Sequence, residues 1–272
     1  MKKLLNKNYL FFFLGLVILT SCATNPFTGK STIALVGNNT LFASSFVQYQ
    51  EFLDENKIIT GTPEANMIQR AGNRIRMAAE RWASVEGQPG YFSNYQWEFN
   101  LVDSDVINAW AMPGGKIVFY SGILPITRDE AGVAVIMGHE VAHAILNHGQ
   151  QRVSISLIQQ LGAVGVSVLT AAQSQETQIV ALAAYSASTT LLGTLPYSRA
   201  NEIEADKIGL VLMIIAGYDP QAAVDFWERM SSYGGASVPQ FLSTHPSDST
   251  RINELRKYIP EARRIAARVG RI

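Results

Sequence analysis

Two histidines and a glutamate in this chain have the spacing of a metal-binding motif. His139 and His143 stand four residues apart, and Glu140 follows the first directly. On a helix this H-E-x-x-H spacing turns both imidazoles toward one metal ion. Glu140 then points to the side, where it can hold a metal-bound water. The pattern is typical of a zinc site that hydrolyses peptide bonds.

A cluster of carboxylates downstream can complete such a site. Glu202 and Asp206 are four residues apart and share one face of a helix, whereas Glu204 points away from them. A carboxylate can complete a His2Glu set and leave the fourth zinc position open for water. We therefore predict that His139, His143 and Glu202 bind one Zn²⁺ per chain. Asp206, one turn later, is expected to hydrogen-bond the far nitrogen of a ligand histidine and fix its tautomer.

A third histidine follows the motif at a different spacing. His148 lies nine residues after His139, and Leu146 and Asn147 precede it. One zinc-protease pattern has its third histidine ten residues on, after a helix-breaking glycine. Because that glycine is missing here, we expect the helix to continue and His148 to point away, as a supporting or surface residue.

The elements that position these residues form a mixed pattern in which helices dominate. Residues 128–146 predict a buried helix with acidic residues in its first turn. Helices are also expected over 41–56 and from Pro63 to about Trp82, with Thr62 as the N-cap. Periodicity of two predicts short strands at 96–102, 108–112 and 116–120. The predicted fold is α+β, mostly α-helical and zincin-like, with a small sheet beside the H-E-x-x-H helix.

The strands directly before this helix allow two roles. An edge strand beside the metal can pair with an extended substrate through backbone hydrogen bonds. An ordinary hairpin that supports the helix is the alternative, and both roles are compatible.

A long apolar stretch, residues 151–198, separates the two clusters. Two membrane spans or two buried helices would explain it. Gln159, Gln160 and the polar break at 173–178 leave the apolar segments short, so we predict two buried helices.

The N-terminus indicates the compartment. Residues 1–21 combine a basic start with a short apolar run, as in a secretory signal, and Leu19-Thr20-Ser21-Cys22 resembles a bacterial lipobox. Cys22 is the only cysteine and is the predicted lipidation site. The predicted divisions are a lipoprotein signal peptide at 1–21, a lipidated tether at 22–40 and a domain at 41–272. Ala23 favours the outer membrane, so the expected location is its periplasmic side in a bacterial cell envelope.

The balance of acidic and basic residues indicates whether the chain binds nucleic acid. The chain has 22 basic and 22 acidic residues and no net charge. This gives no electrostatic basis for binding nucleic acid, and none is predicted.

The paired clusters resemble the M48 family of zinc metallopeptidases, within the gluzincin group. The resemblance extends to Asn108-Ala109-Trp110-Ala111-Met112-Pro113-Gly114-Gly115 and to Thr244-His245-Pro246. With the lipoprotein signal, the chain is similar to periplasmic members that act in outer-membrane protein quality control. The resemblance implies that His139, His143 and Glu202 bind zinc, that Glu140 is the catalytic base and that Asp206 supports a ligand.

The resemblance also leaves two functions open. The first is an endopeptidase of misfolded or stalled cell-envelope proteins, with a possible link to the outer-membrane assembly machinery. The alternative is a chaperone-like assembly factor with little or self-inhibited proteolysis. His245, by the same resemblance, either assists catalysis as a donor to the transition state or occupies the open zinc position. Arg251 could bind a substrate carbonyl or pair with an acidic residue.

Overall fold

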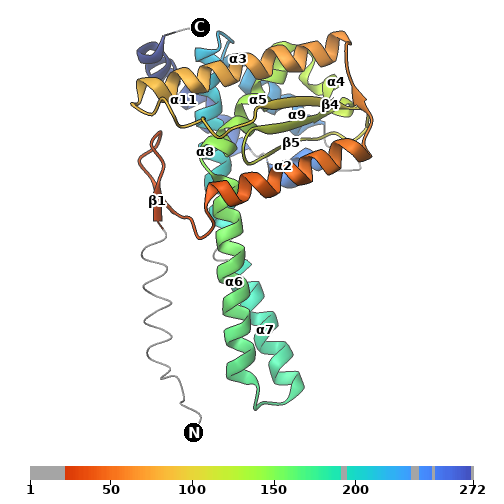
Figure 1. The fold of residues 1–272 in the computed structure, drawn as a ribbon, viewed down its shortest axis with the longest axis vertical. Helices are drawn as coiled ribbons and strands as arrows, with labels where there is room; N and C mark the ends of the chain where they lie inside the picture. Colours follow the sequence, from red (N-terminus) through yellow and green to blue (C-terminus); the bar gives the residue numbers. More distant parts are fainter. Residues whose placement is uncertain (1–21, 191–194, 234–238, 247–248, 271–272) are drawn as a thin grey trace.

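The protein consists of a helical body with a small sheet and a projecting helical arm (Figure 1). The structure is a computed structural model that describes residues 22–190, 195–233, 239–246 and 249–270. The predicted signal peptide at 1–21 lies outside the described residues. The strands are β1 Cys22–Thr24, β2 Ser31–Ile33, β3 Ile58–Ile59, β4 Glu98–Val102, β5 Ala109–Met112 and β6 Lys116–Tyr120. The longer helices are α2 Asn38–Glu55, α3 Pro63–Val85, α5 Glu130–Ile145, α6 His148–Thr170, α7 Gln175–Thr189, α8 Leu195–Ile215, α9 Gln221–Ser232 and α11 Ser249–Val269, and the short ones are α4 Leu124–Thr127 and α10 Gln240–Thr244.

The sheet has the order β3-β4-β6-β5, which leaves β5 at one edge. β5 and β6 form the predicted hairpin, with Ala111 opposite Ile117. β4 pairs with β6 in parallel, and the two-residue strand β3 adds to β4 in antiparallel orientation. The three predicted strands are therefore confirmed, whereas β3 is too short to carry a periodic signal.

The predicted helix boundaries hold within a few residues for α2, α3 and α5. Thr62 caps α3, because its hydroxyl accepts a hydrogen bond of 3.2 Å from the backbone N–H of Ala65. Asp129 caps α5 in the same way through the N–H of Gly132 at 2.9 Å. The body is α+β and mostly helical, with α5 beside the sheet, as predicted, and packed against α3, α8 and α9 (Figure 1).

The helices that carry the two clusters, α5 and α8, touch backbone to backbone. A Cβ added to Gly138 would lie 2.9 Å from the carbonyl oxygen of Gly209, and one added to Gly209 would lie 2.9 Å from the carbonyl carbon of Gly138. The two helices can approach this closely only because neither glycine has a side chain. This crossing places His139 against the carboxylates of α8.

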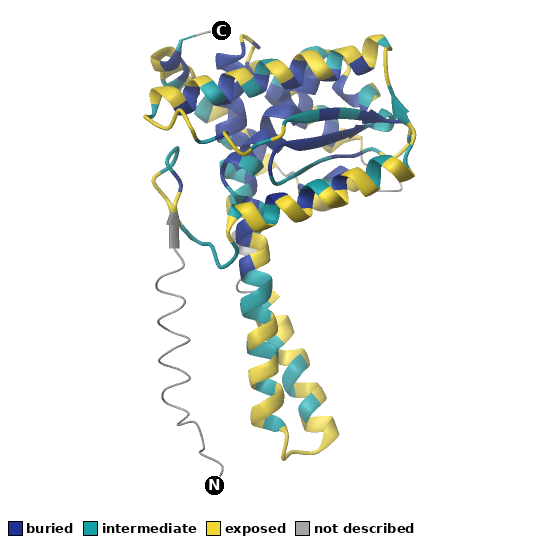
Figure 2. Ribbon diagram, in the orientation of Figure 1, coloured by how far each residue is buried: buried dark blue, intermediate teal, exposed yellow. Residues whose placement is uncertain are grey.

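The apolar stretch after the H-E-x-x-H motif forms the arm, α6 and α7, and the prediction that these helices are buried is wrong. They pack on each other and project from the body, with exposed and intermediate residues along both (Figure 2). By length and composition α6 is capable of crossing a membrane, although only 6% of its most apolar window is buried in the protein. Hydrophobicity alone does not distinguish a core helix from one that leaves the core.

The segment expected to be a tether contains ordered structure. β1 and β2 form an antiparallel hairpin, with Cys22 opposite Ile33. The side-chain amide of Asn25 donates to the carbonyl oxygen of Ile145 at 2.9 Å, and the Phe27 ring contacts Trp82 with 5.2 Å between ring centroids. These contacts fix the hairpin to the C-terminal ends of α5 and α3.

Candidate metal centre

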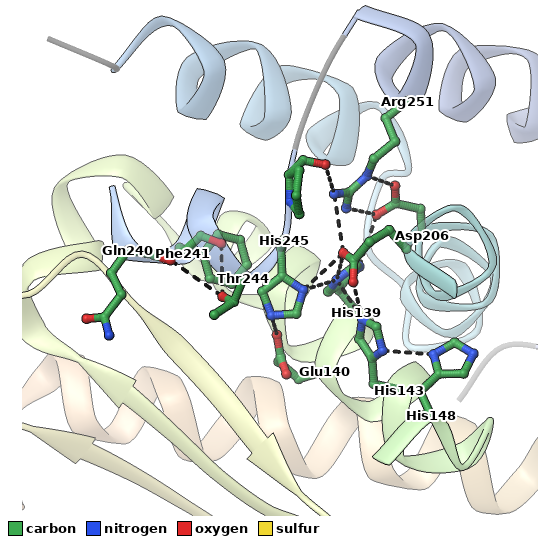
Figure 3. A network of polar contacts seen from close by, with 12 residues as sticks. His139, Glu140, His143, His148, Asp206, Gln240, Phe241, Thr244, His245 and Arg251 are labelled. Carbon is green, nitrogen blue, oxygen red and sulfur yellow. Dashed lines mark hydrogen bonds and ion pairs between the residues drawn. The ribbon is translucent and has the colours of Figure 1, made fainter. Parts of the chain in front are cut away.

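The three predicted metal ligands converge at the crossing of α5 and α8 (Figure 3). The Nε2 atoms of His139 and His143 are 3.1 Å apart. The Glu202 carboxylate lies 3.2 Å from His139 Nε2 through Oε2 and 3.4 Å from His143 Nε2 through Oε1. All three side chains are largely or wholly excluded from solvent, so their lone pairs face one another instead of water.

His245, at the end of α10, brings a fourth donor atom to the same point. Its Nδ1 lies 3.1 Å from His139 Nε2 and 3.0 Å from Glu202 Oε2. The ligand atoms of His139, His143, Glu202 and His245 all lie within 4.8 Å of one another. Of the two positions considered for His245, the structure has the one inside the ligand set.

The donor set fits a zinc ion. Zinc binds imidazole nitrogen and carboxylate oxygen at about 2.0–2.1 Å in tetrahedral geometry, which separates neighbouring donors by about 3.3 Å. The closest donor atoms observed here are 3.0–3.4 Å apart. Three nitrogens and a carboxylate converging in a buried space repel one another unless protons or a cation lie among them.

Asp206 and Arg251 stand behind His139. Asp206 Oδ1 is 3.0 Å from His139 Nδ1, which is the contact expected from its position one turn after Glu202. Arg251 donates to the same carboxylate through Nε at 2.6 Å and Nη2 at 2.8 Å, and its guanidinium lies over the ring of Trp227. Of the two roles left open for Arg251, the structure has the pairing with an acidic residue.

Glu140 lies beside His245 in a dry environment. It is 3% exposed, and its Oε1 has no hydrogen-bond partner among the described residues. The Nε2 of His245 is 3.4 Å away, and the backbone of Ala111 in β5 hydrogen-bonds to the Glu140 carboxylate. Burial raises the pKa of Glu140, which makes this carboxylate a better proton acceptor than an exposed one.

The prediction that the H-E-x-x-H helix continues to His148 is wrong. α5 ends at Ile145, and Asn147 adopts the left-handed conformation with φ 56° before α6 begins. This break turns His148 back toward the site, where its Nδ1 lies 2.8 Å from His143 Nδ1. Asparagine tolerates this conformation better than most residues, so Asn147 was a usable signal for a helix end.

Glu204 supports His148 and not the metal ligands. It is 3.6 Å from His148 Nε2 and pairs with Lys30 of the N-terminal hairpin at 2.9 Å. A row of polar residues thus runs from the β1–β2 hairpin to His143. It could not be predicted from the sequence, because its members are far apart in the chain.

The charges of the site follow from its burial and pairing. Burial disfavours the charged form of His139, but its bonds to Asp206 and Glu202 outweigh this and raise its pKa to about 9. Burial lowers the pKa of His143. Burial would raise the pKa of Glu202, yet hydrogen bonds from the surrounding histidines hold it well below its ordinary range. The glutamate is therefore an anion ready to bind a cation.

Two hollows meet at His143. One lies between this histidine and the end of the edge strand, at Ala111, Met112 and Pro113. The other, of about 200 Å³, runs along the foot of α6 past Arg152 and Ile155 to the start of α8. The candidate centre is thus open on the side of the sheet edge and on the side of the arm.

This arrangement agrees with a comparison against known families. Residues 69–259 match peptidase family M48, and the match includes both clusters. The chain belongs to peptidase family M48. The family's chemistry implies a bound metal, which the donor set described above fits.

Relatives of this M48 peptidase include enzymes from mitochondria and bacteria. The human "Metalloendopeptidase OMA1, mitochondrial" is 30% identical over 90% of this chain and 47% of its own length. "Mitochondrial metalloendopeptidase OMA1" of Schizosaccharomyces pombe is 37% identical over 62% of this chain and 49% of its own. The "Beta-barrel assembly-enhancing protease" of Escherichia coli is 33% identical over 59% of this chain and 34% of its own. The M48 peptidase therefore spans half or less of the length of these relatives.

Proposed function

We propose that this M48 peptidase is a zinc-dependent endopeptidase of misfolded or stalled cell-envelope proteins. The observation that carries the proposal is the convergence of His139, His143 and Glu202 beside the buried Glu140. Three protein ligands with a neighbouring carboxylate are the composition of a catalytic zinc site, whereas structural sites close all four positions with protein ligands, usually Cys or His.

In this mechanism His139, His143 and Glu202 would hold the zinc ion, which supplies Lewis-acid activation of water and of the substrate carbonyl. Glu140 accepts the proton of the attacking water and returns it to the leaving amine. Its raised pKa suits both transfers. Asp206 keeps the proton of His139 on Nδ1, so that the Nε2 lone pair stays directed into the site.

The substrate would lie along the outer edge of β5. The sheet ends at this strand, and the hollow at Ala111, Met112 and Pro113 leads from the strand to His143. Backbone pairing to an edge strand holds an extended chain without reading its side chains. Such a site accepts unfolded segments and excludes folded proteins, which supports misfolded proteins as the substrate class.

The proposed location is the periplasmic side of the outer membrane, with a lipid anchor on Cys22. The lipobox-like Leu19–Cys22 and the name of the Escherichia coli relative support it, while the mitochondrial relatives show that the family also works elsewhere. The proposed divisions remain a signal at 1–21, a lipidated segment at 22–40 and a peptidase domain at 41–272. A link to outer-membrane assembly machinery is part of this proposal.

The position of His245 favours a second function, a chaperone-like assembly factor with self-inhibited proteolysis. Its ring fills the space between Glu140 and the other three donors, where water must enter. With His245 in this position the proposed zinc would have four protein ligands, and catalysis requires the ring to leave.

Cleavage of casein by the full chain tests both functions, with zinc quantified in each sample. The endopeptidase is supported if the parent cuts and Glu140→Gln does not, while both hold one zinc. If the parent is inactive with zinc bound and His245→Ala cuts, the self-inhibited form is supported. Zinc bound by the parent and by both variants without any cutting contradicts the endopeptidase, and a parent without zinc contradicts the metal centre.

A further inference from the structure

The arm, α6 and α7 (His148–Thr170 and Gln175–Thr189), presents an unusual surface. Between Val153 and Ser198 the sole charged residue is Glu176. Large apolar side chains on both helices are between 56% and 75% exposed. They are Leu161, Val164, Val168, Leu169, Ile179 and Val180. A helix pair that faces water carries charged residues on its outer side, and a helix without them is found in a core or a membrane. The arm is not in the core.

Several hydroxyl groups of the arm donate to carbonyl oxygens of their own helix. Ser167 donates to the carbonyl oxygen of Ala163 at 3.0 Å, and Thr170 donates to that of Val166 at 2.8 Å. On α7, Ser188 donates to the carbonyl oxygen of Ala184 at 2.7 Å. Hydroxyls bonded to the preceding turn in this way can lie in hydrocarbon, where no water is present to accept them.

The contact between α6 and α7 depends on small residues. Gly162 lies so close to Tyr185 that an added Cβ would overlap the phenol oxygen. That oxygen donates to the carbonyl of Gln159 at 3.3 Å and so joins the helices. Close approach at small residues is how helices associate in lipid, where burial of apolar surface gives no driving force.

The dimensions and position of the arm agree with a bilayer. The charge-free part of α6 after Arg152 is about 27 Å long, close to the roughly 30 Å of bilayer hydrocarbon. Ser154, whose hydroxyl accepts from the N–H of Leu35, is the last buried residue of α6, and every residue after it in this helix is exposed or intermediate. The β1–β2 hairpin lies beside this foot of the arm (Figure 1), and Cys22, which begins β1, pairs with Ile33 of β2, two residues before Leu35. A lipid on Cys22 would thus enter a membrane at the level where the arm becomes exposed.

We propose that the arm inserts into the same lipid bilayer that holds the acyl chain on Cys22, with its exposed apolar side chains against lipid tails. The M48 body then rests on the membrane surface, and the hollow along the foot of α6 opens beside that surface. The choice of this bilayer rests on the proposed lipid anchor at Cys22, whereas the assignment of the arm's surface does not depend on the proposed cleavage reaction.

Site-specific fluorescence of the acylated full chain tests the insertion. Cys22 is the single natural cysteine, so introduced cysteines at Val168 and Val180 can carry a nitrobenzoxadiazole dye. Val47 on α2 is a matched control, because it is an exposed valine on a helix of the body. The unsubstituted chain measures any labelling of Cys22. Each protein is reconstituted into vesicles of phosphatidylethanolamine and phosphatidylglycerol, with and without nitroxide-labelled acyl chains.

Insertion predicts blue-shifted emission at both arm positions and quenching by the nitroxide lipid at least twofold greater than at Val47. The double substitution Val164→Lys and Leu169→Lys should abolish this excess quenching at Val168 without altering the unfolding of the body. The control Val47→Lys should leave the excess quenching at Val168 unchanged. Emission at the arm that is blue-shifted but unquenched would overturn the proposal in favour of a protein partner. If the arm positions emit like Val47, the arm is surrounded by water and the proposal is overturned.

Discussion

Replacement of Arg251 by leucine should destabilise the body strongly, and it also removes an ion pair with the predicted metal ligand Glu202, whose Oε2 lies 3.3 Å from Nη1 of Arg251. Arg251 and Asp206 are 4% and 6% exposed and share two hydrogen bonds, and Arg251 also donates to the carbonyl of Pro246 at 2.7 Å. Leucine leaves the Asp206 carboxylate buried with His139 as its remaining hydrogen-bond partner among those described. Breaking one side of a buried pair costs about 3–5 kcal/mol.

We expect the lower end of that range, because leucine keeps apolar contact with Trp227 and His139 still donates to Asp206. A loss of about 3 kcal/mol corresponds to a Tm lower by about 6–12 °C for a domain of this size. The assay is thermal unfolding of the detergent-solubilised full chain by circular dichroism, with chelator present so that metal binding does not contribute. Arg256→Leu is the control, since Arg256 forms a half-exposed pair with Glu228 and should leave Tm nearly unchanged.

A double-mutant cycle with Asp206→Asn decides whether the pair itself is responsible. The two losses should be less than additive by about 1–3 kcal/mol, because the second substitution removes a group that the first has already left unpaired. Strict additivity, or an Arg251→Leu variant as stable as the parent, would refute the reasoning.

Three further predictions concern ligand access, helix approach and pH. His245→Ala should raise casein cleavage severalfold with one zinc still bound, and lower activity together with lost zinc would contradict the blocking position of the ring. Gly209→Ala should lower the free energy of unfolding by about 1–3 kcal/mol, because the added methyl group forces α8 away from Gly138. It should also weaken zinc binding in a competition assay. An unchanged stability and zinc affinity would contradict the close crossing. Burial alone raises the pKa of Glu130, but bonds from Tyr218 and two arginines outweigh this and lower it from 4.5. The stabilisation by ionised Glu130 is therefore present above pH 4.5 and lost below it. The Tm difference between the parent and Glu130→Gln should shrink as the pH falls from about 6 to about 3. A Tm difference that stays constant over this range would contradict the role of Glu130.

The sequence predicted the parts of the site that depend on local periodicity. Four-residue spacing placed His139 with His143 and Glu202 with Asp206, and each pair lies on one helix face as expected. The paired role of Arg251 could not be derived, since only the folding of α11 onto α8 brings it to Asp206.

Two errors have different physical causes. The helix was wrongly expected to continue to His148, because a single left-handed residue, Asn147, redirects the chain and helix periodicity does not register such a break. The supporting role left open for His148 agrees with its contact to His143. The arm was assigned to the core because hydropathy measures the preference of a side chain for an apolar medium and not which medium surrounds it. The parallel pairing of β4 with β6 likewise depends on contacts that no single strand encodes.

The break at Asn147 also sets His148 and the far end of α6 at very different distances from the point where the chain changes direction. The far end of α6 lies about 35 Å from this point, while His148 is the first residue beyond it. A tilt of about 5° about the break moves the far end by about 3 Å but displaces His148 by only a few tenths of an ångström. Because Gln150 and Ser154 also hydrogen-bond the first turns of α6 to the body, movement of the far end leaves the ring that supports His143 almost still. The geometry of the candidate metal centre is thus mechanically insulated from the arm.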